Sequence, residues 1–282
     1  MTDALQMLER RLAELERVVV AFSGGADSAF LAFVATRVLG PERAHAVTAV
    51  SASLASDEHA DCRALAEEWG LRWTPIVTDE LADAAYRAND IDRCFHCKTE
   101  LMRVVAPMAR AEGATVVLGV NVDDLGDHRP GQRAATEHGA RFPLVDAGFD
   151  KAMVRAASRA LGLRTWDKPA AACLASRLPY GTTVTLRRLT QVDRAEAALR
   201  RLGFRQLRVR HYDDLARIEL DSNELVTAVE RREDVIAAVK AAGYRYATLD
   251  LEGFRSGNLN DGLVGSASPV ARSGFDAGPS GS

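Results

Sequence analysis

The stretch that decides the fold is Ser23-Gly24-Gly25-Ala26-Asp27-Ser28, which lies between the apolar runs 18–22 and 29–34. The first run predicts a strand and the second the start of a helix, so the stretch forms the turn that joins them. Its two glycines let the backbone adopt positive φ and approach a ligand closely. The first N–H groups of the helix then point at an anion lying there. The stretch is therefore predicted to bind phosphate, with an ordinary polar turn as the alternative.

Length and composition are typical of an ordinary globular protein. The chain has 282 residues, of which 47% are hydrophobic and 27% charged, and its formal net charge is −3. The length predicts one large domain and a smaller one. No apolar run approaches the roughly 20 residues that cross a bilayer, and residues 1–17 lack the apolar core of a signal peptide. We therefore expect a cytoplasmic protein with no membrane role, and the absence of a basic excess argues against a nucleic-acid partner.

Strands and helices alternate over the first part of the chain. This alternation predicts an α/β fold in which a parallel sheet is flanked by helices. Ligands of such sheets bind beyond the carboxyl ends of the strands, where the loop starting at Ser23 would lie. Asp57 is the expected N-cap of its helix. Strands are expected over 18–22, 44–51, 71–77 and 115–120, and helices over 5–16, 57–70, 99–112 and 150–161.

The pattern changes after residue 181 and predicts a smaller α+β unit. Helices are expected over 185–202 and 222–242, and strands over 206–211, 216–220 and 246–251. We therefore predict a first domain (1–166), a connecting segment (167–181), a domain for substrate or oligomer contacts (182–258) and a tail (259–282). The tail is rich in Gly, Ser, Ala and Pro and is expected to be disordered.

The connecting segment carries one of the four cysteines, Cys173. A helical turn from Cys173 to Arg177 would place the guanidinium beside the thiol and favour the nucleophilic thiolate, whereas a small buried side chain is the alternative. Cys94 and Cys97 form a lone Cys-x-x-Cys, which cannot complete a four-ligand zinc site. We interpret this pair as structural or substrate-lining, with a redox pair as the alternative. Cys62 is expected to pack in the core.

Four motifs together resemble one family. Residues 23–28 resemble the SGGxDS signature of the PP-loop ATP pyrophosphatases, which split ATP between its α- and β-phosphates. Residues 94–98, 119–131 and 167–181 narrow the resemblance to LarE, a family of ATP-dependent sacrificial sulfur transferases. The similarity covers most of the chain and ends near Leu259. It implies an enzyme whose cofactors are ATP and Mg²⁺.

The resemblance implies a reaction on a pyridinium dicarboxylate mononucleotide, in the synthesis of a nickel-pincer nucleotide. ATP adenylates a carboxylate, a cysteine thiolate displaces AMP, and cleavage of the Cβ–S bond leaves dehydroalanine on the protein. Cys173 lies where the family has its sacrificial cysteine. Some members instead hold an iron–sulfur cluster with three cysteines, but Cys173 has no partner cysteine near it in the sequence. We therefore expect the single-turnover type.

The residue types at the loop suit adenylation independently of the family. Loop N–H groups and Mg²⁺ would neutralise the departing pyrophosphate, and Asp27 is the nearest carboxylate for that metal. Serine hydroxyl groups can donate to phosphate oxygens. For Asp123, capping of a helix is the alternative. The expected nucleotide-binding residues are Ala21, Ser23, Gly24, Gly25, Asp27, Ser28, Gly119, Asp123 and Arg129.

Basic side chains supply candidate contacts for an anionic substrate. Two arginines lie on one face of the strand expected over 206–211, and such a pair suits a phosphate or a carboxylate. The resemblance implicates this pair together with a glutamate from the next strand and an arginine near the end. For these charges, a solvated surface is the alternative. The expected substrate contacts are Lys98, Arg208, Arg210, Glu219 and Arg255.

The resemblance also implies a homo-oligomer, often a hexamer, and Glu196 lies at a family acidic position that contacts a metal or a subunit boundary. Two other functions stay open. A tRNA thiolase or an amidating synthetase would share the loop. The thiolase would also need an RNA-binding module and a second catalytic cysteine, and the synthetase would need a source of ammonia. A regulatory nucleotide-binding protein would keep the loop and dispense with Cys173.

Overall fold

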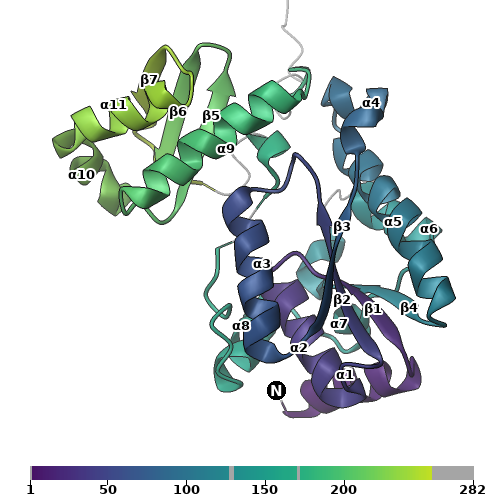
Figure 1. The fold of residues 1–282 in the computed structure, drawn as a ribbon. Helices are drawn as coiled ribbons and strands as arrows, with labels where there is room; N and C mark the ends of the chain where they lie inside the picture. Colours follow the sequence, from purple (N-terminus) through teal and green to yellow (C-terminus); the bar gives the residue numbers. More distant parts are fainter. Residues whose placement is uncertain (1, 127–129, 170–171, 256–282) are drawn as a thin grey trace, which may run out of the picture.

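The computed structural model describes residues 2–126, 130–169 and 172–255 (Figure 1). It contains a four-stranded sheet of order β3-β2-β1-β4 and a three-stranded sheet of order β5-β6-β7. The expected α/β fold with a smaller α+β unit is confirmed. The predictions for Arg129 and for the tail 259–282 fall outside the described residues. No helix within the described ranges is long and apolar enough to cross a membrane.

All strand pairs of the first sheet are parallel. From β1 the chain moves outward through β2 and β3, and it then crosses to the other side of β1 to form β4. The carboxyl ends of β1 and β4 therefore flank the switch point at which such sheets bind ligands. The strands are β1 (Val18–Ala21), β2 (Ala44–Val50), β3 (Arg72–Val77) and β4 (Thr115–Leu118).

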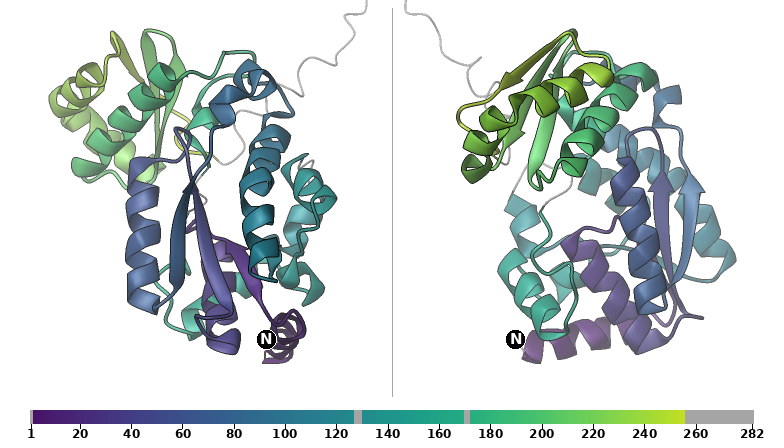
Figure 2. Two further views of the ribbon diagram at one scale, coloured as in Figure 1. Left: turned by 45° about the vertical axis from the view of Figure 1, so that its right-hand side comes forward. Right: turned by 60° about the vertical axis from the view of Figure 1, so that its left-hand side comes forward.

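Helices cover both faces of this sheet, because alternate side chains of its strands enter different cores (Figures 1 and 2). Val18 and Val20 belong to one apolar core, whereas Val19 belongs to the other. The first core includes side chains of α1 (Thr2–Glu14), α2 (Ala26–Leu39), α3 (Ser56–Trp69), α7 (Pro143–Asp146) and α8 (Lys151–Ala160). The second includes side chains of α5 (Arg93–Ala111) and α6 (Pro130–Glu137).

The second sheet pairs β5 (Leu207–Tyr212) antiparallel with β6 (Leu215–Leu220), and β6 parallel with β7 (Tyr246–Leu249). A separate apolar core lies between this sheet and its helices. These helices are α9 (Leu186–Arg201), α10 (Leu225–Glu230) and α11 (Arg232–Ala241). Helix α9 also approaches α3 of the first unit, as Figure 1 shows.

Three helix predictions were wrong in detail. The helix expected from residue 99 begins at Arg93, so the Cys-x-x-Cys motif lies on α5. Helix α3 begins at Ser56 with Ala55 as its N-cap, so Asp57 does not cap it. The helix expected over 222–242 is divided at Arg231, whose φ of −98° and ψ of 26° are not helical. The single turns η1 (Glu80–Ala82), α4 (Ala84–Ala88), η2 (Val122–Gly126) and η4 (Ser222–Glu224) are too short for a periodic signal.

The segment after β4 lies directly against the start of α2. A Cβ atom on Gly119 would lie 2.7 Å from the backbone nitrogen of Ser28 and 2.8 Å from its Cα atom. Both neighbouring atoms are backbone, so no side-chain rotation relieves the clash. Only glycine therefore lets the two sides of the switch point meet.

We expect Gly119→Ala to lower the free energy of unfolding by roughly 1–3 kcal/mol, because the added methyl group overpacks a backbone contact. Gly25→Ala is the matched control, since Gly25 has φ −74° and its Cβ atom would meet nothing nearer than Ser23 Oγ at 3.6 Å. Urea denaturation of both variants checks this. Equal stabilities of the two variants would contradict the assigned contact.

Candidate functional site

The loop between β1 and α2 has the backbone of an anion site. Gly24 has φ +71°, and Gly25 is the N-cap of α2 without any side-chain hydrogen bond. The first N–H groups of α2 are therefore available to a ligand. Ser28 is buried and stabilises the loop itself: Ser28 Oγ accepts from the backbone nitrogen of Ser23 at 3.2 Å and donates to the Gly25 carbonyl. Ser23 is exposed, and its hydroxyl group lies 3.0 Å from Ser28 Oγ.

Asp27 lies at the mouth of the switch point and accepts a hydrogen bond from Asn121 Nδ2 at 3.2 Å. Burial raises the pKa of Asp27; the Asn121 hydrogen bond opposes this shift, and the nearby Asp124 adds to it. Asp124 is buried and pairs with Lys151 Nζ at 3.2 Å. Asp123 accepts from the backbone nitrogen of Lys151 at 3.0 Å. Asp123 thus contacts the start of α8, as its capping alternative predicted.

The connecting segment reaches this loop through Lys168, which the sequence analysis did not single out. Lys168 Nζ donates to the Gly24 carbonyl at 3.1 Å, to Glu58 at 2.7 Å and to Asp61 at 2.6 Å. These two carboxylates raise the pKa of Lys168 against the opposing effect of its burial. The one sequence signal for Lys168 was its place in the motif 167–181.

Cys173 precedes the short 3₁₀ turn η3 (Leu174–Arg177) and is partly exposed. The backbone nitrogen of Leu174 donates to the Ser53 carbonyl at 2.9 Å, which fixes the turn beyond the carboxyl end of β2. Ser53 in turn bonds the hydroxyl group of buried Tyr86. The thiol of Cys173 therefore lies at the ligand-binding edge of the sheet, on the same segment as Lys168.

A second cysteine lies near Cys173 in the fold, although no cysteine lies near Cys173 in the sequence. Cys97, on α5, packs with Cys173 on one small apolar cluster. Burial raises the pKa of the Cys97 thiol to about 12, and burial raises that of Cys62 to about 11. Both thiols are therefore protonated near neutral pH and poor nucleophiles. The prediction that Cys62 packs in the core is confirmed, because it is fully buried.

Lys98 lies among these thiols rather than on an open surface. The pKa of its ammonium group is raised, mainly by Cys97 and further by Cys94, Cys173 and Glu80, while burial opposes the shift. Gly131 of α6 approaches its side chain, since a Cβ atom there would lie 2.8 Å from Lys98 Cγ. The structure thus places a cation within electrostatic reach of Cys97 and Cys173.

Arg177 lies near the Cys173 thiol, which after Glu196 contributes to the raised pKa of Arg177, but the hydrogen bonds of its guanidinium in the described structure go to other groups. It bonds both oxygens of Glu196, at 2.8 and 3.1 Å, and it donates to the carbonyl groups of Ala172 and Cys173. Glu196 also accepts from Arg200 and from the backbone nitrogen of Val209. Because its two oxygens already have cationic donors, Glu196 is not suited to a metal, and that expectation is withdrawn.

The two strand arginines are buried, and their environments differ. Arg210 pairs with both oxygens of Glu219, at 2.9 and 3.0 Å, and donates to the Ser176 carbonyl at 2.8 Å. Arg208 stacks on Phe254, with its guanidinium carbon 4.6 Å from the ring centroid. Burial, together with Arg177 and Arg210, lowers the pKa of Arg208 to about 10. In the part of the chain that the structure describes, Arg208 has no carboxylate bonded to it, so it is a candidate anion ligand.

Two further features lie at the margins of the site. Arg255 is exposed and pairs with Glu252.

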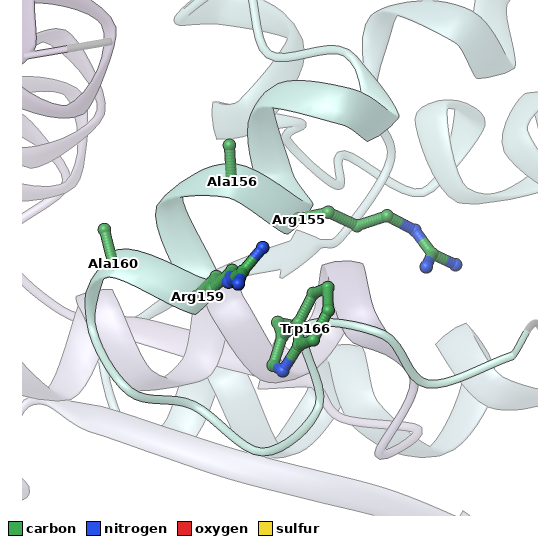
Figure 3. Close-up of a pocket in the computed structure, with 5 residues that line it drawn as sticks. All are labelled: Arg155, Ala156, Arg159, Ala160 and Trp166. Carbon is green, nitrogen blue, oxygen red and sulfur yellow. The ribbon is translucent and has the colours of Figure 1, made fainter.

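A shallow cavity of about 530 Å³ lies along α8 and is lined by Arg155, Arg159 and Trp166 (Figure 3). Arg159 stacks on Trp166 at 4.9 Å, whereas Arg155 extends away from them and donates to the Lys168 carbonyl at 3.2 Å. Arg155 thus supports the segment that holds Lys168.

The parallel sheet and the glycine loop at its switch point define an ATP-using α/β enzyme of the PP-loop class. Residues 3–102 match the NAD synthase family. The chain is 40% identical over 254 residues to the pyridinium-3,5-bisthiocarboxylic acid mononucleotide synthase of Lactiplantibacillus plantarum, covering 90% of this chain and 92% of the relative. This chain belongs to the LarE family, as its motifs led us to expect.

Two uncharacterized relatives share nearly the whole chain. One, from Synechocystis, is 45% identical over 259 residues, which cover 91% of this chain and 96% of the relative. The other, from Methanocaldococcus jannaschii, is 24% identical over 242 residues, covering 86% and 92%. The similarity therefore includes the glycine loop, the connecting segment and the second sheet together.

The ion pair between Arg177 and Glu196 predicts a pH dependence of stability. Burial alone would raise the pKa of Glu196, but Arg177 and its other donors hold it below the ordinary value of 4.5. A carboxylate with a depressed folded-state pKa stabilises the fold above its unfolded pKa and loses that contribution as the pH falls through the folded value. We expect Glu196→Gln to cost about 3–5 kcal/mol at pH 7, because buried Arg177 and partly exposed Arg200 lose their partner.

This difference between Glu196→Gln and the unmutated protein should shrink once the pH falls below about 4.5, the ordinary value for a glutamate. Urea denaturation at several pH values checks it. Glu252→Gln is the control, because Glu252 is exposed and pairs only at the surface. A penalty for Glu196→Gln that stays constant with pH would contradict the assigned ion pair.

Proposed function

We propose that this protein adenylates a carboxylate of a pyridinium dicarboxylate mononucleotide and transfers to it the sulfur of Cys173, as one step of nickel-pincer nucleotide synthesis. The printed name of the relative from Lactiplantibacillus plantarum states a product with two thiocarboxylic groups on a pyridinium mononucleotide. One sulfur per chain implies that two chains are consumed for each such product.

The observation that carries the proposal is the course of the connecting segment. At one end Lys168 contacts the Gly24 carbonyl, and at the other Arg210 donates to the Ser176 carbonyl. Cys173 lies between these anchors and is partly exposed. Among the cysteines of the connecting segment and its surroundings, Cys173 is both accessible and placed between the glycine loop and the arginines of β5.

The chemistry follows from what these groups can do. A carboxylate becomes electrophilic once AMP is its leaving group. The thiolate of Cys173 attacks the carbonyl carbon and displaces AMP, giving a thioester. A base then takes the Cα proton of Cys173, the Cβ–S bond breaks, and its electron pair leaves with the sulfur as a thiocarboxylate. Dehydroalanine remains at position 173, so each chain reacts once.

Different residues of the loop suit different parts of the bound nucleotide and its metal ion. The free N–H groups at Gly25 and the start of α2 suit the phosphates, and Ala21 and Gly119 border the same switch point. Asp27 has carboxylate oxygen for Mg²⁺, which prefers one or two carboxylates together with phosphates and water. Within the described ranges no group of three or more acidic, His or Cys side chains is arranged to hold a metal. When bound, Mg²⁺ would neutralise the departing pyrophosphate.

The mononucleotide is expected to use the basic residues around the turn η3. Arg208 is buried and has no carboxylate bonded to it among the residues that the structure describes, and Lys98 lies within electrostatic reach of Cys173. Arg210 and Glu219 pair with each other, so we assign them the role of holding Arg208 and the turn in place. Arg255 lies near the end of the described chain, and its role as an anion contact remains a proposal. The proposed active form is a homo-oligomer.

One observation favours a second candidate function. Cys94, Cys97 and Cys173 all act on the pKa of Lys98, so the three thiols lie around one side chain. Thiolates are the ligands of iron–sulfur clusters, and such a cluster would deliver sulfur over many turnovers. The described residues hold no three such side chains grouped for a metal as they stand, so we derive no step through a cluster.

Intact-protein mass spectrometry decides between the two candidates. After incubation with ATP, Mg²⁺ and the pyridinium substrate, we expect the chain to lose the mass of one H₂S at position 173, because elimination leaves dehydroalanine. Cys173→Ala should still release pyrophosphate yet form no thiolated product. Cys97→Ser is the control and should lose the same mass as the unmutated chain. An unchanged mass despite product formation would contradict the sacrificial mechanism.

Arg208→Gln tests the anion site. We expect the KM for the mononucleotide to rise roughly 10- to 100-fold, since a charge-assisted hydrogen bond to the substrate is lost. Arg205→Gln is the matched control, because Arg205 is exposed just before the same strand. Because each chain reacts once, the rate of pyrophosphate release in a single turnover is measured at a series of mononucleotide concentrations, and the half-saturating concentration serves as the KM of each variant. Equal KM values for Arg208→Gln and Arg205→Gln would remove Arg208 from the site.

A further inference from the structure

Lys168 occupies a place that the reaction as described does not use. Its ammonium group has three N–H donors, and the structure gives each an acceptor: the Gly24 carbonyl, Glu58 and Asp61. Arg164 pairs with the other oxygen of Asp61 at 2.7 Å. Glu58 has no second cation among its contacts in the described structure. One cation thus bridges the phosphate loop and two acids of α3.

The position of Lys168 makes it sensitive to an anion on the loop. Because Nζ already contacts the carbonyl group of Gly24, a phosphate bound by the neighbouring N–H groups lies in its immediate vicinity. Lysine is a point charge on a flexible stem, so it can exchange one anionic partner for another. A polyphosphate carries more charge than the single carboxylate of Glu58. The exchange therefore favours the phosphate when nucleotide is present.

We propose that Lys168 is a positioning residue that couples nucleotide on the loop to the position of Cys173. Five residue steps separate Lys168 from Cys173, so their Cα atoms lie at most about 18 Å apart. A shift of Lys168 toward a bound phosphate therefore changes the point from which the chain leads to Cys173. The far end is held, because Leu174 bonds the Ser53 carbonyl and Arg177 bonds Glu196. This inference rests on the proposed function, in which Cys173 is the sulfur donor.

The test measures the rate at which iodoacetamide alkylates Cys173, with and without saturating α,β-methylene-ATP. Tryptic peptide 165–177 carries Cys173 and reports its modification separately from that of Cys94. In the unmutated protein we expect nucleotide to change this rate about fivefold or more. In Lys168→Met, saturated with nucleotide, the two rates should be equal, and nucleotide affinity should be roughly tenfold weaker.

Two further variants keep the test decisive. Arg164→Met is the matched control, because it also removes a cation from Asp61 but does not touch the loop, and its rate ratio should equal that of the unmutated protein. Glu58→Gln should tighten nucleotide binding by releasing Lys168, and this gain should vanish when Lys168→Met is added. A merely structural lysine would produce neither effect, so these readouts hold even where Lys168→Met is less stable.

The result that would overturn the coupling is a nucleotide-dependent alkylation ratio in Lys168→Met equal to that of the unmutated protein. Absence of any nucleotide effect in the unmutated protein would overturn it too. Failure of the proposed function is distinguishable from both outcomes. In that case alkylation still responds to nucleotide through Lys168, while the mass of the chain stays unchanged after product formation.

Discussion

The ion pair between Arg177 and Glu196 is the interaction on which the site depends. It holds the turn that follows Cys173 against α9, and the other guanidinium contacts of Arg177 hold the carbonyl groups of Ala172 and Cys173. A buried pair of this kind is costly to break, because either partner alone is an uncompensated charge. The thiol therefore has a defined place, which the buried side chains of Leu174, Ala175 and Leu178 in the same segment also support.

Electrostatics divide the site into satisfied and unsatisfied charges. Glu196 and Glu219 each have two arginine partners, so these four arginines are committed to the fold. Arg208 has none of these carboxylates bonded to it and carries a lowered pKa. A cation left over in a buried cluster is stabilised by an incoming anion. In the proposed function, substrate charge would supply the anion that Arg208 lacks among the described residues.

The sequence was sufficient for the fold and the phosphate loop, because both depend on local patterns. Apolar runs of strand length, glycines with a turn function and helix periodicity all act within short stretches. Local patterns could not predict contacts between residues that are distant in the sequence. Cys97 and Cys173 are distant in sequence and meet only because α5 begins early, and Lys168 finds Gly24 only through the folded connecting segment. For Glu196 the spacing to Arg200, four residues further along α9, was a local sign of an ion pair, but no local pattern pointed to Arg177.

The origin of the transferred sulfur tests the central claim most directly. The protein is produced with heavy-isotope-labelled sulfur in its cysteines and incubated with ATP, Mg²⁺, the pyridinium substrate and unlabelled sulfide. The account predicts that the thiocarboxylate product carries the heavy isotope, because its sulfur is the Sγ atom of Cys173. A product that carries only the light isotope of the added sulfide would contradict it.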